Sequence, residues 1–99
     1  MATLDARLRF AIQHRRVIQF NYQDALRIAE PHDYGISRDR LRLLAFQLRG
    51  HSKGPLPGWR MFDVDRMEQL VVLDDTFLGS RERAGQSHKQ WDVLFCRVE

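Results

Sequence analysis

"RIAEPHDYGISRDRLRLLAF", residues 27–46, predicts two strands joined at a tip that is rich in positive charge. Arg38, Arg40 and Arg42 recur at every second position, and in an extended chain that spacing sends all three side chains to one face. A guanidinium group pairs with phosphate or carboxylate and stacks on nucleobases. The stretch therefore predicts a basic face on a β-sheet.

The two predicted strands differ in regularity. Pro31 removes a backbone donor, so the first strand should end, bulge or lie at an edge there. Gly35 then supplies the freedom for a turn or a bulge. Residues 40–49, "RLRLLAFQLR", form the strongest predicted strand, with one face made by Leu41, Leu43 and Ala45. The arginine-bearing face continues into three apolar residues, Leu44, Phe46 and Leu48.

The rest of the chain predicts one helix and several short strands. A helix is expected over about residues 3–16, where apolar residues recur at helical spacing: Leu4, Leu8, Ala11 and Ile12. Strands are expected at 17–23, 59–65 and 89–98, a loop at 50–58, a polar segment at 79–88, and either a helical turn or a strand at 66–75. This order predicts a single, mostly β domain with one N-terminal helix, whose partly open barrel spans about residues 17–77.

Composition limits the classes of function. The chain has 99 residues and a net charge of +3, and since only Lys53 and Lys89 are lysines, 16 − 2 = 14 of its basic residues are arginine. Residues 1–50 carry 9 basic against 5 acidic residues, so the positive excess lies in the first half. Either a GC-rich genome or anion recognition explains this preference for arginine.

No catalytic or metal-binding pattern stands out. The single Cys96 lies in an apolar run, which favours a buried, inert thiol. The four histidines lack metal-ligand spacing, and Asp63 and Asp65 have no third ligand nearby, so no cofactor is expected. His32 directly follows a proline, and either caps a turn or lines a pocket. A non-enzymatic, cytoplasmic protein is expected, since neither a signal peptide nor a membrane span is evident.

The basic residues and the aromatic residues are interleaved. If the strand at 59–65 neighbours the strand at 40–49, Arg60 and Arg66 join the arginine row. The aromatic residues in these segments are Tyr34, Phe46, Trp59 and Phe62. Guanidinium groups beside aromatic rings bind single-stranded nucleic acid or a nucleotide. The alternative is a solvated edge that is kept charged to prevent strand-to-strand aggregation.

The order of these pieces resembles the WYL domain family, found mostly in bacterial transcription regulators. The resemblance covers about residues 8–77 and rests on four pieces in order: "AIQHRRVIQFNY", "RIAEPHDYG", "RLRLLAF" and "RMFDVDRMEQLVVLDDTF". The Trp-Tyr-Leu triplet that names the family falls on Leu41, Arg42 and Leu43, and Asp63 replaces an arginine common in the last piece. The resemblance implies a small SH3-like or Sm-like barrel.

The resemblance also implies a ligand sensor that binds single-stranded nucleic acid or a nucleotide-like ligand in a basic groove. It carries over His32, Arg60 and Arg66, with Arg42 standing where the family has its tyrosine. Arg40 and Arg27 are second-rank candidates. The family's DNA-binding helices have no counterpart in these residues, so an effector protein or a DNA-binding partner is expected. The alternative is a protein-interaction module, such as a homodimer joined through an open barrel edge or the strand at 89–98.

Overall fold

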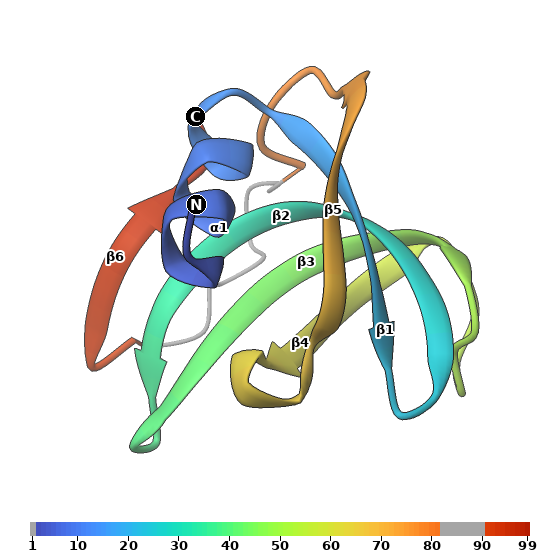
Figure 1. Ribbon diagram of the computed structural model, residues 1–99, viewed down its shortest axis with the longest axis horizontal. Helices are drawn as coiled ribbons and strands as arrows, with labels where there is room; N and C mark the ends of the chain where they lie inside the picture. Colours follow the sequence, from blue (N-terminus) through green and yellow to red (C-terminus); the bar gives the residue numbers. More distant parts are fainter. Residues whose placement is uncertain (1, 82–90) are drawn as a thin grey trace.

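The computed structural model describes residues 2–81 and 91–99 as one helix and six strands (Figure 1). In chain order they are α1 (Leu4–Gln13), β1 (Arg16–Tyr22), β2 (Ala25–Ser37), β3 (Arg40–Gly50), β4 (Gly58–Asp63), the 3-10 turn η1 (Val64–Arg66), β5 (Glu68–Thr76) and β6 (Val93–Arg97). The observed helix is thus shorter at both ends than the predicted one, which covered about residues 3–16. The segment for which a helical turn or a strand was predicted begins at the end of the 3-10 turn and continues as a strand.

All strand pairs are antiparallel, in the order β4-β3-β2-β1-β5, with β6 paired to β2. β4 and β5 end this order without pairing to each other, so the sheet curls but does not close. Figure 1 shows β2 and β3 as long bent strands crossed by β1 and β5. The predicted class, a mostly β, partly open barrel with one N-terminal helix, is confirmed.

β2 carries strands along both of its edges. One edge pairs with β3 throughout, whereas the other pairs with β1 up to Ala29 and with β6 from Asp33 onward. Pro31 lies between these two partners, where its missing N–H removes no bond to either. The pairing with β3 shifts register between Pro31 and Asp33, so the predicted bulge is present.

The turn of the β2–β3 hairpin begins three residues beyond Gly35, the glycine that indicated a turn or a bulge. Arg38 and Asp39 form the turn with φ of 52° and 60°, as a two-residue hairpin turn requires. Arg38 therefore does not share a strand face with Arg40 and Arg42. Gly35 lies inside β2, where a Cβ would come 2.1 Å from the carbonyl oxygen of Val93.

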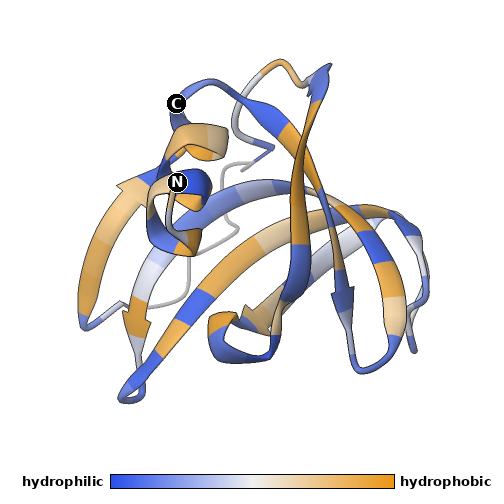
Figure 2. Cartoon of the chain, in the orientation of Figure 1, coloured by the Kyte–Doolittle hydropathy of each residue, from blue (hydrophilic) through white to orange (hydrophobic). Residues whose placement is uncertain are grey.

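The core lies on the inner face of the sheet, defined by the buried side chains of Leu43, Ala45 and Phe62. α1 covers this face with Leu8, Ala11 and Ile12, which are completely buried. The hydroxyl of the buried Tyr34 donates to Asp5 of α1 at 2.7 Å and so ties helix to sheet. Figure 2 shows hydrophilic and hydrophobic residues alternating at the start of β3, followed by a hydrophobic stretch in its middle.

Other predicted boundaries moved or lie outside the described residues. The C-terminal strand is shorter than predicted, Val93–Arg97, and most of the polar segment at 79–88 falls outside the described residues. Asp65 lies in η1 and not on a strand, so it does not share a strand face with Asp63. In the described residues, no helix has the length and apolar character needed to cross a membrane.

Gly35→Ala should destabilise the domain by about 1–3 kcal/mol, because the added methyl group forces β6 away from β2. Urea denaturation followed by tryptophan fluorescence measures this change. Glu68→Ala, at an exposed position of β5, is the control and should stay within about 0.5 kcal/mol of the wild type. Equal stability of Gly35→Ala and wild type would contradict the close approach of these strands.

Candidate functional site

Arg40 and Arg42 of β3 lie on the outer face of the sheet, opposite the core. Arg42 pairs in register with Asp63 of β4, and their side chains form an ion pair at 3.2 Å. Arg40 donates to the other oxygen of Asp63 at 3.1 Å. One carboxylate thus compensates much of the positive charge that the sequence placed on this strand.

Arg60 lies on the inner face, because it pairs in register with Ala45, while Arg42 pairs with Asp63 three residues along β4. The prediction that the two strands are neighbours is confirmed, since β3 pairs with β4, yet their register places Arg42 and Arg60 on opposite faces of the sheet. Arg66 is exposed at the end of η1. The candidate arginines therefore do not form a single cluster, and the aromatic residues are also divided, with Phe62 inside and Phe46 and Trp59 outside.

Arg60 shares a pocket of about 200 Å³ with Arg27. We call it the Arg27–Arg60 pocket, and its lining residues are Tyr22, Gln23, Arg27, His51, Ser52, Lys53, Gly54, Arg60, Met61 and Phe62. They come from the end of β1, its turn to β2, the start of β2, the loop after β3, and β4. The lining includes two arginines and a lysine but neither aspartate nor glutamate, so the pocket is positively charged.

Arg27 is the least solvated cation of the pocket. Its side chain is 6% exposed, and its guanidinium lies over the rings of Tyr22 and Phe62 at 5.6 and 6.0 Å. One terminal nitrogen donates to the carbonyl of Tyr22 at 3.3 Å, and the buried Nε has no hydrogen-bond partner. Burial lowers the pKa of Arg27, as does the charge of Arg60 to a smaller extent, while Tyr22 opposes the change.

Arg60 is held by the loop that precedes its strand. Its Nε donates to the hydroxyl of Ser52 at 2.9 Å, and its terminal nitrogens donate to the carbonyls of Pro55 at 2.8 Å and Trp59 at 2.7 Å. These acceptors are all neutral. The guanidinium is therefore oriented at the pocket without being neutralised.

His32 does not line the Arg27–Arg60 pocket. It is completely buried, with its ring stacked on Phe77 at 5.6 Å and against the edge of Trp59 at 4.7 Å. Its Nδ1 lies 2.9 Å from the carbonyl of Glu30, and its Nε2 accepts the backbone N–H of Arg81 at 3.1 Å. Both ring nitrogens are therefore used within the fold, and burial lowers the pKa of this histidine.

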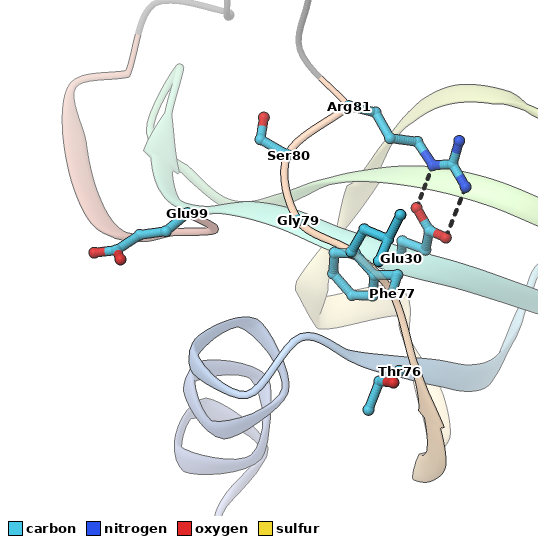
Figure 3. Close-up of a pocket in the computed structure, with 8 residues that line it drawn as sticks. Glu30, Thr76, Phe77, Gly79, Ser80, Arg81 and Glu99 are labelled. Carbon is cyan, nitrogen blue, oxygen red and sulfur yellow. Dashed lines mark hydrogen bonds and ion pairs between the residues drawn. The ribbon is translucent and has the colours of Figure 1, made fainter.

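A second, larger pocket of about 790 Å³ is lined by residues that include Glu30, Phe77 and Arg81 (Figure 3), and all three contact His32. Arg81 binds the buried carboxylate of Glu30 with two hydrogen bonds and lies 4.5 Å from the Phe46 ring centre. Glu99 also lines this pocket. Its single arginine is thus already paired, and the pocket offers an anion less than the Arg27–Arg60 pocket does.

Several lining residues were missed by sequence reasoning. Residues 50–58 were interpreted only as a loop, but His51, Ser52 and Lys53 all line the Arg27–Arg60 pocket. The signal was the serine and lysine between two glycines. Within the described residues there is no group of three metal-ligating side chains. Cys96 is partly buried, and burial raises the pKa of its thiol.

The structure thus combines a small, partly open barrel with a basic pocket that no aspartate or glutamate lines. The WYL domain family model matches residues 4–72, which is most of the chain. The chain belongs to the WYL domain family, and is thus a domain of a regulatory, ligand-sensing kind. No curated protein and no solved structure matches it.

The buried His32 predicts a loss of stability on mild acidification. Its folded pKa is lowered, so between that value and about 6.5 the unfolded chain binds more protons, and stability falls as pH falls. Urea midpoints between pH 7.5 and 5.5 should decrease less for His32→Gln than for wild type. His51→Gln, in the exposed loop, should retain the wild-type decrease; a wild-type slope in His32→Gln would contradict this assignment.

Proposed function

We propose that this WYL domain binds a phosphate-bearing ligand, single-stranded nucleic acid or a nucleotide, in the Arg27–Arg60 pocket and acts as a non-catalytic sensor. The observation that carries the proposal is the buried Arg27, whose Nε lacks a partner and which shares its pocket with a second arginine, Arg60. Burying an unpaired charge costs several kcal/mol unless an opposite charge compensates it. A bound anion supplies that charge.

The outer arginines make a useful comparison. Arg40 and Arg42 share the carboxylate of Asp63, so an anion there competes with an existing partner. The pocket has no such competitor among its lining residues. Tyr22 and Phe62 are buried, and their rings lie against the Arg27 guanidinium on its core side, where they shield its charge from water. These contrasts favour the inner pocket over the predicted arginine row.

Binding of a fluorescein-labelled ten-residue oligothymidylate (dT10) should weaken with salt. If the three cations of the pocket neutralise three phosphates, log affinity should fall against log salt with a slope of about −2, at about −0.7 per phosphate. Fluorescence anisotropy at several salt concentrations measures this slope. Affinity that does not respond to salt would refute phosphate pairing.

Arg27→Met should flatten the slope by about 0.7, because the methionine keeps most of the apolar volume and removes one charge. Arg40→Ala is the matched control, since it also removes one arginine but from the outer face. Anisotropy titrations at several salt concentrations should give a flatter slope for Arg27→Met than for Arg40→Ala. Equal effects would indicate general charge attraction, and an unchanged slope for Arg27→Met would remove Arg27 from the site.

A second candidate function is self-association through β6, with one specific observation in its favour. Within the described residues, β6 pairs with β2 alone, and its Val93 and Leu94 are 47% and 39% exposed. An unpaired edge with exposed apolar side chains is a template for strand addition. Light scattering after size exclusion should then give a dimer mass that Leu94→Lys reduces to a monomer. A wild-type monomer at all concentrations would exclude it.

A further inference from the structure

The loop at residues 51–57, which connects β3 to β4, is largely exposed but firmly anchored at its start. The backbone N–H of His51 donates to the carbonyl of Leu26 at 3.0 Å, and the side-chain amide of Gln47 donates to the carbonyl of His51 at 2.9 Å. Beyond His51, Ser52 and Pro55 are held by the Arg60 guanidinium. The loop thus begins on the sheet and then folds around one charged side chain.

Two glycines allow a close contact between this loop and Arg60, and a larger residue at either position would displace the guanidinium slightly. A Cβ at Gly54 would lie 3.0 Å from one terminal nitrogen of Arg60, and a Cβ at Gly58 would lie 3.0 Å from the other. Three of the five N–H groups of Arg60 bind the loop and its own strand. A ligand can use the remaining N–H groups while the loop stays in place.

The hydroxyl proton of Ser52 is not used in the hydrogen bonds that hold the loop. Its hydroxyl oxygen accepts from Arg60 Nε at 2.9 Å and from the backbone N–H of Gly54 at 3.3 Å. A hydroxyl has two acceptor sites and one proton, so the proton is available to an acceptor such as a phosphate oxygen. The neighbouring Lys53 also lines the pocket and is exposed.

We propose that the 51–57 loop closes over the bound anion and is the element that reports occupancy of the Arg27–Arg60 pocket. This inference rests on the proposed function of that pocket. The ligand contacts Arg27 and Phe62 on the sheet and Ser52 and Lys53 on the loop. It thereby bridges the sheet and the part of the loop beyond His51, which is held by Arg60. Because the bridging contacts exist only when the loop is closed, ligand binding favours the closed loop.

The same coupling acts in the reverse direction. A change that disfavours the closed loop lowers the affinity for the ligand by the same factor, since the linkage between loop closure and ligand binding is reciprocal. Ser52 is therefore a positioning residue: it orients Arg60, holds Gly54, and turns its proton toward the pocket. The 51–57 loop is thus an exposed segment whose order depends on the ligand, which is what a regulatory domain needs to signal occupancy.

Hydrogen exchange measured by mass spectrometry, with and without saturating dT10, tests the proposal. The amides of residues 52–54 and 56 should exchange several-fold more slowly with dT10 present, while those at the Arg38–Asp39 turn should not change. Ser52→Ala should lower dT10 affinity at least about fivefold and reduce the protection of the loop. Ser52→Thr keeps the hydroxyl and should restore both.

The outcomes separate this inference from the function on which it rests. Binding of dT10 with unchanged exchange in the loop would overturn the loop's role and leave the pocket intact. Wild-type affinity and wild-type protection in Ser52→Ala would also overturn it. Absence of dT10 binding to the wild type would overturn both the proposed function and the closing loop.

Discussion

The two-sided pairing of β2 is the constraint on which the rest of the structure depends. One strand holds β3 along its whole length and divides its other edge between β1 and β6. The division falls at Pro31, which pairs with neither β1 nor β6, so its missing backbone donor removes no bond to either of these strands. The bulge after Pro31 then places Asp33 beside Arg97 of β6 with an ion pair at 3.0 Å, and buries Tyr34 under α1.

The hairpin of β2 and β3 also determines where positive charge is compensated and where it is not. On the outer face, Asp63 meets Arg40 and Arg42. On the inner face, Arg27 and Arg60 approach each other at the end of the core, held by aromatic rings and neutral carbonyls. The net charge of the chain therefore does not indicate where an anion would bind. The positions of the carboxylates on the two faces of the sheet are more informative.

The regularities of single segments were predictable. Alternation along β3 gave a strand with Leu43 and Ala45 on its buried face, and helical spacing gave α1 with Leu8 and Ile12 inward. The proline indicated the bulge. The glycine in the same stretch misled, because Gly35 serves the close approach of β6, and the turn is made by two non-glycine residues with positive φ. Nothing within the hairpin sequence reveals a strand that arrives from residues 93–97.

The sequence by itself determined the strands, the helix, the family and the supply of arginines, because side-chain period and turn chemistry are local properties. Only the tertiary structure decided which arginines meet. A shift of one residue in the β3–β4 register would put Arg60 on the face of Arg42, since side chains alternate along a strand. That register is set by packing of Phe62 against Phe20 and Tyr22, which come from another part of the chain.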